Sequence, residues 1–281
     1  MSKMKKSINI SLSYLLLVCG GVIMVYPLIW LFFASFKPSN EIFGTAALIP
    51  STFSFDGYVR GWAGAGQYSF GVFYYNTFRL VLPVVSFTII SCCVVAYGFA
   101  RFRFPFKRFF FAIMISTLML PSSVMLVPRY IMFRDLGWLN TYLPFIVPSI
   151  FATGPFFIFL LVQFFRGIPK ELDESAYIDG CNSLYLLYKI ILPLSKPALF
   201  SVGLFQFMWT WNDFFQPLIY INSVSRYTLA LGLRMSMDVS SGINWNNVLA
   251  MSFVTILPLI ILFFFTQKYF VEGITTTGLK G

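Results

Sequence analysis

Six long apolar stretches alternate with shorter polar segments along the chain. They run near residues 10–35, 80–100, 108–128, 140–165, 198–221 and 247–267. Each could cross about 30 Å of hydrocarbon, which takes roughly 20 helical residues. Because open strands cannot satisfy their backbone groups in lipid, the stretches predict helices. The pattern therefore predicts an all-α integral membrane protein, with one domain of six transmembrane helices over residues 1–281.

The composition agrees with a membrane protein. Hydrophobic residues make up 58% of the chain and charged residues only 11%, whereas a soluble domain carries about 25% charged residues. The first apolar stretch is too long for a signal peptide, contains Pro27 and Trp30, and lacks a small-residue cleavage site. We therefore expect it to remain as the first transmembrane helix.

The basic residues predict the orientation of the chain. If the N-terminus is cytoplasmic, thirteen of the 20 Lys and Arg residues fall on the cytoplasmic side, including the cluster RFRFPFKR at 101–108. This bias follows the positive-inside rule, so the net charge of +10 reflects topology rather than binding to nucleic acid. Both termini and residues 166–197 are predicted to be cytoplasmic, and residues 222–246 to be outside.

Several kinds of chemistry are excluded by what the sequence lacks. The chain has no histidine, which rules out imidazole metal sites and Ser-His-Asp or Cys-His catalysis. The four cysteines show no metal or disulfide pattern, so we expect neither. The C-terminal GLKG lacks the spacing and the hydroxyl of a phosphate-binding loop. The chain is thus predicted not to be an enzyme, and any ATP must be hydrolysed by a partner.

One polar passage interrupts the apolar chain, ELDESAYIDGCNSLYLLYKIILPLSKPAL at 171–199. Pro169 and the three carboxylates that follow it predict the start of a helix, and Gly180 predicts its end. The spacing of Leu184, Leu187, Tyr188 and Ile191 predicts a second, amphipathic helix. The passage could be an interfacial helix that anchors the bundle. Its acidic groups would be repelled by anionic lipid, however, and instead favour docking into a basic cleft of another protein.

The passage also carries a specific motif. Glu174-Ser175-Ala176 is followed after three residues by Gly180, and after nine more by Ile190, a variable position and Leu192-Pro193. This spacing resembles the EAA signature of bacterial ABC-importer permeases, in which the first three residues are Glu-Ala-Ala. Only Ser175 departs from that signature, as one small residue in place of another.

Other segments extend the resemblance over the whole chain. YNTF at 75–78, AYGFARFRF at 96–104, FMWTWNDFFQPL at 207–218 and YFVEGITTTGLKG at 269–281 are similar to the maltose-type carbohydrate-uptake permeases. Among these the chain resembles the smaller, MalG-like subunit. The resemblance implies a type I ABC importer permease with six spans.

The resemblance implies a coupling role for the polar passage, as a helix that sits in a cleft of an ATPase subunit. Glu174 would pair with a basic group there, Ala176 and Gly180 would allow close approach, and Leu184, Leu187 and Ile190 would pack the two short helices together. The implied coupling residues are Glu174, Ser175, Ala176, Asp179, Gly180, Leu184, Leu187, Ile190 and Pro193.

The C-terminal tail at 271–281 is small and nearly uncharged, which on general grounds favours disorder. The resemblance implies instead that it inserts between two ATPase subunits, with Thr275, Thr276, Thr277 and Gly278 at that interface.

A substrate path is predicted near Asp213, the acidic residue well inside the fifth stretch. Trp209, Trp211 and Asn212 lie beside it and suit sugars, whose apolar faces stack on aromatic rings. An equally good alternative is that Asp213 and Asn212 have a purely structural role and only bridge neighbouring helices. The fifth and sixth stretches contain no basic residue, which argues against a strongly anionic substrate.

The outer loop at 222–246 resembles the scoop segment that enters the sugar cleft of a docked binding protein. The resemblance implies binding-protein contacts at Arg234, Met235, Ser236, Met237, Asp238, Ser240, Gly242 and Asn244.

Together these features predict a permease subunit of an ABC importer that moves a carbohydrate, specifically an oligosaccharide, into a bacterial or archaeal cell. The expected partners are a second permease in a heterodimer, an ATPase dimer, an extracellular or periplasmic solute-binding protein and the lipid bilayer. No cofactor is expected in this chain, with ATP and Mg on the ATPase. The alternatives are an importer for a polyol or glycerol phosphodiester, and a stand-alone channel or secondary transporter.

Overall fold

The computed structural model of the chain describes residues 2–64, 67–237 and 243–278. Every regular element in these ranges is helical. The chain divides into two compact units, one of Met1–Phe70 with Leu233–Leu257 and one of Gly71–Gly232 with Pro258–Gly281. They are called unit 1 and unit 2 below.

Unit 1 contains α1 (Ser2–Ala34), α2 (Ser39–Ile42), α3 (Asp56–Ala63) and the first part of α15 (Trp245–Gly278). Close backbone approach holds it together, since a Cβ on Gly57 would meet the side chain of Asn246 and one on Gly61 that of Met251. Phe32 near the end of α1 packs edge-to-face on Phe253. The most apolar 18-residue window of the span Ile10–Ala34 has no buried residue in the described chain, so this part of α1 is open to lipid or to another protein.

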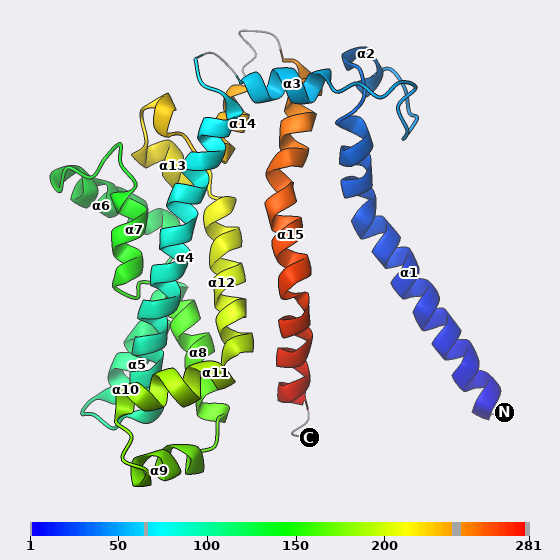
Figure 1. Cartoon of the computed structure of the whole chain (residues 1–281). Helices are drawn as coiled ribbons and strands as arrows, with labels where there is room; N and C mark the ends of the chain where they lie inside the picture. The colour runs from blue at the N-terminus through cyan, green and yellow to red at the C-terminus, as the bar shows by residue number, and fades with distance from the viewer. Residues whose placement is uncertain (1, 65–66, 238–242, 279–281) are drawn as a thin grey trace. The chain divides into compact units, whose positions relative to one another are not determined.

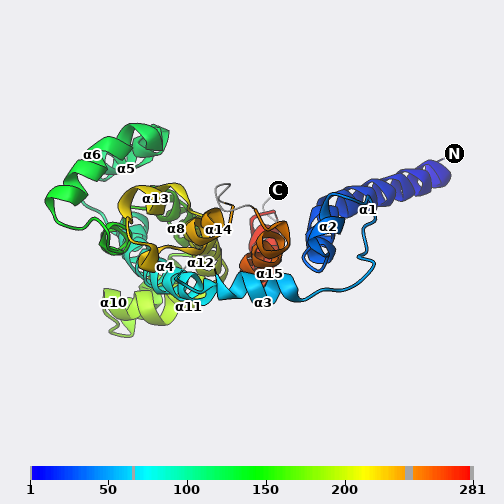
Figure 2. The ribbon, with the colours of Figure 1, turned by 90° about the horizontal axis from the view of Figure 1, so that it is seen from above.

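Unit 2 is built around α4 (Phe70–Arg101), α8 (Pro155–Gly167) and α12 (Lys196–Trp211), which run side by side in both views (Figures 1 and 2). Buried apolar side chains of these three helices form one continuous core with the polar passage. Its members include Cys92, Tyr97, Phe157, Leu161, Phe165, Leu186, Ile191 and Val202.

The third apolar stretch is broken rather than straight. It forms α5 (Lys107–Ser116) and η1 (Thr117–Met119), then turns by 103° into α6 (Ser122–Asp135). The break falls at Leu120, whose extended backbone (ψ 123°) is what the following Pro121 requires.

The fourth and fifth stretches are interrupted as well. Residues 151–154 separate α7 (Leu143–Ile150) from α8, and residues 212–214 separate α12 from α13 (Phe215–Tyr220). The apolar pattern alone predicts one helix in each place, because it contains no information on where a backbone turns. Short elements η3 (Val224–Arg226) and α14 (Leu229–Met235) follow α13.

Within the described residues, four helices are long and apolar enough to cross a membrane alone, and there are up to six candidate spans if each bent pair is counted as one. The chain is therefore a multi-pass membrane protein. Within unit 2, the polar passage lies at one end of the bundle and α13 at the opposite end (Figure 1).

Candidate functional site

The polar passage begins with the short helix α9 (Glu171–Ile178), whose first turn carries Glu171, Asp173 and Glu174. It ends in a Schellman motif, in which Cys181 N donates to Ala176 O over 2.9 Å and Gly180 N donates to Tyr177 O over 3.1 Å. Gly180 adopts φ +79°, a left-handed conformation that favours glycine.

The two small residues of α9 have different surroundings within the chain. A Cβ on Gly180 would meet no described atom within 4 Å, so within this chain the glycine is needed for the turn. Ala176 is 4% exposed and belongs to the core of unit 2. Its small side chain lets α9 pack closely on the core of unit 2, whereas Gly180 is exposed. A role for the two residues in contact with a partner stays a prediction.

The second helix of the passage is irregular: α10 (Ser183–Leu186), a π-helical turn η2 (Leu187–Ile191) and α11 (Leu192–Leu194). Asn182 caps it by accepting a hydrogen bond from Tyr185 N over 2.8 Å. Ile190 is half-buried and Pro193 is exposed.

The buried face of this helix differs from the expected one. Leu186, Leu187 and Ile191 are buried, while Leu184 is 75% and Tyr188 67% exposed. Leu184 was expected to pack the two helices together, which is wrong. Residues four apart share a helix face, so Leu184 and Tyr188 point away together, and Leu186, about 200° around the axis from Leu184, points inward.

A buried ion pair fastens α9 to the end of α4. Arg101 Nε lies 2.9 Å from Asp173 Oδ2, and the two side chains are 4% and 12% exposed. Arg101 Nη2 also donates to Ile168 O over 3.1 Å. Burial raises the pKa of the Asp173 carboxyl more than the Arg101 guanidinium lowers it. The sequence places these residues 72 positions apart, so only the fold reveals the pair.

The outward surface of the passage is both acidic and apolar. Glu171, Glu174 and Asp179 are exposed beside exposed Ile178, Tyr185 and Tyr188. Ser175 is also exposed, but its hydroxyl donates to backbone oxygens of its own helix. An acidic surface with apolar side chains is suited to a basic protein partner rather than to anionic lipid.

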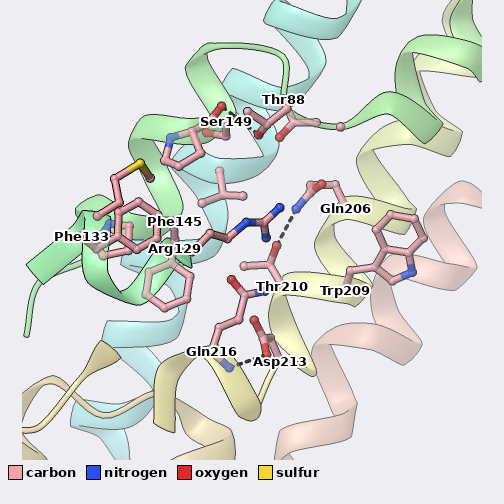
Figure 3. Close-up of a pocket in the computed structure, with 16 residues that line it drawn as sticks. Thr88, Arg129, Phe133, Phe145, Ser149, Gln206, Trp209, Thr210, Asp213 and Gln216 are labelled. Carbon is pink, nitrogen blue, oxygen red and sulfur yellow. Dashed lines mark hydrogen bonds between the residues drawn. The ribbon is translucent and has the colours of Figure 1, made fainter. Parts of the chain in front are cut away.

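A cavity of about 360 Å³ opens inside unit 2 (Figure 3). Its lining combines aromatic rings, hydroxyls, amides and one charge of each sign. These groups come from α4, α6, α7, α12 and α13 and from the α7–α8 and α12–α13 connections. The polar and aromatic members are Thr88, Arg129, Phe133, Phe145, Ser149, Thr153, Gln206, Trp209, Thr210, Asp213 and Gln216.

One face of α12 supplies the polar wall of the cavity. Gln206 and Thr210 are four residues apart, which places them on one face of α12, and Asp213 follows in the turn after the helix. Gln206 Nε2 donates to Thr210 Oγ1 over 2.8 Å, and Asp213 Oδ1 accepts from Gln216 N over 3.2 Å. The same spacing in the sequence could have identified Gln206 and Thr210, which we did not predict.

The cavity contains two of the four predicted substrate-path residues, Trp209 and Asp213. Trp211 points elsewhere: it is 2% exposed and stacks on Phe207 with ring centroids 5.2 Å apart. Asn212 is exposed and donates to Met208 O on its own helix. Trp211 and Asn212 therefore do not line this cavity, whereas Asp213, in the turn after α12, does.

Arg129 was predicted only as an outer basic residue. The turn at Pro121 brings α6 against the cavity, and Figure 3 shows the Arg129 side chain reaching toward Gln206 and Thr210. In the described part of the chain no carboxylate pairs with it. The cavity therefore has a basic residue in its lining. The argument against a strongly anionic substrate considered only the fifth and sixth stretches and did not include this residue.

The loop after α13, which the sequence predicts to be outside, is anchored in unit 2 by the YNTF segment. Asn76 Nδ2 donates to Ser225 O and Tyr227 O over 2.9 and 3.0 Å, and Leu229 N donates to Thr77 Oγ1 over 2.8 Å. Both side chains are buried. These bonds give the motif a structural purpose, which is to hold the loop on the start of α4.

Three of the predicted binding-protein contacts, Asp238, Ser240 and Gly242, lie outside the described residues. Of the others, Arg234 and Asn244 are exposed, and Met235, Ser236 and Met237 are half-buried. Asn244 Oδ1 accepts a hydrogen bond from Ser39 over 3.4 Å.

The C-terminal tail residues Thr275, Thr276, Thr277 and Gly278 continue α15 as helix.

Gly232 offers a stability test of the loop anchor. A Cβ there would lie 2.2 Å from Cδ2 of Phe73, a buried ring on α4. We expect Gly232→Ala to displace α14 and to lower the melting temperature, with an overpacking cost of about 1–3 kcal/mol. Gly98→Ala is the matched control: its Cβ would meet open space in the last turn of α4, and the substitution should stabilise the helix slightly. Equal melting temperatures for the two variants would contradict this packing.

Comparison with known proteins places these features in context. The family model for the binding-protein-dependent transport system inner membrane component matches residues 93–276. The chain is 34% identical to the arabinooligosaccharides transport system permease protein AraQ of Halalkalibacterium halodurans, over 99% of this chain and 100% of that protein. It is 32% identical to the galactooligosaccharides transport system permease protein GanQ of Bacillus subtilis, over 99% and 98%.

One solved structure shares the fold. It is the crystal structure of a bacterial ABC transporter involved in the import of the acidic polysaccharide alginate, with a TM-score of 0.83 and 25% identity. The match covers 96% of this chain and 99% of that chain.

Proposed function

This chain belongs to the family of binding-protein-dependent transport system inner membrane components, and we propose from this that it imports an oligosaccharide as one half of an ABC transporter's membrane pathway. It is a multi-pass protein of the bacterial inner membrane. The observation that carries the proposal is the exposed acidic helix α9, formed by the EAA-like motif and ended by Gly180. An importer permease needs such a surface to receive motion from an ATPase.

The carbohydrate class is supported by two independent lines. The relatives named above transport arabinooligosaccharides and galactooligosaccharides. The cavity combines the Trp209, Phe133 and Phe145 rings with amide and hydroxyl groups, and sugars need apolar faces to stack on and polar groups for their hydroxyls. Arg129 and Asp213 add a strong donor and a strong acceptor.

The partners follow from the same role. A second permease completes the pathway, an ATPase dimer binds ATP with Mg and contacts α9 through Glu174, and a solute-binding protein delivers the sugar on the other side. In this arrangement both termini are cytoplasmic. Arg234 to Met237 and Asn244 face the binding protein, and the end of α15 approaches the ATPases.

The mechanism is a transfer of motion through α9. When the ATPases close around ATP, they move α9, and its ion pair with Arg101 passes the movement to α4. Because α4 contributes Thr88 to the cavity wall, the cavity changes its access from one side of the membrane to the other. This chain makes no covalent change in the sugar.

The test is to isolate the chain in mild detergent and then to reconstitute what copurifies with it. We expect a second multi-span protein and an ATPase, with ATP hydrolysis stimulated by a sugar-loaded binding protein. Gln206→Ala with Trp209→Ala should raise the sugar concentration for half-maximal uptake about tenfold, which is the effect of losing one or two polar and stacking contacts.

Asn212→Ala, which changes an exposed residue beside the cavity, is the control and should leave uptake unchanged. A chain that copurifies alone, or that passes solute without ATP, would support the channel alternative and refute the importer. Equal uptake by the double variant and the control would remove the cavity from the path without affecting the importer assignment.

A further inference from the structure

Four cations converge where the α4–α5 connection meets the end of α8. Arg103 lies in the connection, Lys107 and Arg108 begin α5, and Arg166 is in the last turn of α8. We call these four residues the basic cluster. They line two concave pockets of about 430 and 390 Å³, and both pockets contain Lys107 and Arg108.

No acidic side chain in the described part of the chain neutralises the basic cluster. None of its members forms an ion pair there; Lys107 Nζ donates to Phe102 O over 2.8 Å, and the Arg166 guanidinium lies 5.3 Å from the centre of the Phe111 ring. The charged groups that act on Lys107 are Arg166, Lys170 and Arg103, all of them cations. By contrast, the nearby Arg101 is paired with Asp173.

A topology signal alone does not require this arrangement. The positive-inside rule needs basic residues in the loop, but it does not require residues from two separate segments to share a pocket. Mutual repulsion of cations costs free energy unless an anion neutralises them. The convergence therefore points to an anionic ligand.

The surroundings of the basic cluster indicate which anion. Phe106, which lines one of the pockets, is 75% exposed, and the exposed apolar surface continues along α5 through Phe109, Phe110 and Ile113. Free phosphate would leave these rings uncovered. Because α5 belongs to a candidate membrane span, its exposed face meets acyl chains rather than a soluble protein. A lipid would cover them with its acyl chains while its phosphate met the cations.

We propose that the basic cluster binds the phosphate headgroup of an anionic phospholipid, whose acyl chains lie along the exposed face of α5. Lys107 and Arg108 contact the phosphate from the edge that both pockets share, and Arg166 and Arg103 contact it from either side. The site shares no lining residue with the cavity, and it does not depend on what the chain transports.

The experiment is native mass spectrometry of the purified full chain, with any bound partners, from micelles containing equal amounts of phosphatidylglycerol and phosphatidylcholine. The wild type should retain phosphatidylglycerol preferentially. Each removed cation should weaken retention about fivefold, so Lys107→Gln with Arg108→Gln should lower it more than tenfold. Lys107→Arg, which keeps the charge, should retain the lipid and shows that the position tolerates substitution.

Lys189→Gln with Lys196→Gln is the matched control, because it removes two exposed cations outside the basic cluster. Equal loss in both double variants would mean a diffuse charge effect and would overturn the site. Displacement of the lipid by inorganic phosphate alone would overturn the role of the acyl chains. Unchanged lipid with loss of a copurifying ATPase would assign the basic cluster to a protein contact and overturn the proposal.

Discussion

Glu174→Lys is expected to abolish ATP-driven uptake while leaving the helical bundle folded. Glu174 is exposed in the first turn of α9 and has no ion-pair partner in the described chain, so the substitution removes little from the fold. In the proposed assembly it faces a basic group of the ATPase. Placing two like charges opposite each other at an interface costs several kcal/mol, so affinity for the ATPase should fall more than 100-fold.

Copurification of the ATPase and uptake into proteoliposomes measure this effect. Glu174→Gln keeps the shape of the side chain and should retain partial binding. Asp56→Lys is the matched control, because Asp56 is also an exposed carboxylate in a first helical turn, on α3. If Glu174→Lys retains the ATPase as well as Asp56→Lys does, the coupling role of α9 is wrong.

Residues close in sequence made the polar passage predictable. The start of α9 and its stop at Gly180 depend on local rules: a proline, first-turn carboxylates and a residue that tolerates positive φ. The face of the second helix was harder to predict. Leucines at 184, 186 and 187 cover most of the helix circumference, and only the position of the core decides which of them become buried.

The cavity depends on backbone turns that an apolar pattern cannot reveal. Nothing in the hydropathy of residues 108–128 shows that the chain turns at Pro121, and this turn brings Arg129 to the cavity. Asp213 was identifiable from the sequence as an acidic residue within an apolar segment. Its orientation differs from that of Trp211 because the helix ends between them, and helix ends within apolar runs leave only weak sequence signals.

The second large effect is expected at the ion pair between Arg101 and Asp173. Asp173→Asn removes the charge but keeps the side chain's size, and it leaves the buried Arg101 guanidinium unpaired. Losing one partner of a buried pair costs roughly 3 kcal/mol, at the low end of the range. Because α9 is then held less firmly to α4, ATPase closure should move α9 without moving the bundle. We expect ATP hydrolysis to continue while sugar uptake per ATP falls at least fivefold.

The ratio of uptake to hydrolysis separates a positioning role from a general loss of stability, which would lower both activities together. Glu171→Gln removes an exposed carboxylate from the same helical turn, so this control should leave the ratio unchanged. Arg101→Gln combined with Asp173→Asn leaves no buried charge unpaired and should recover stability but not coupling, since the attachment is still missing. A normal ratio in the double variant would show that the ion pair only stabilises α9, and that motion reaches α4 through the buried packing of Ala176 and Leu186 instead.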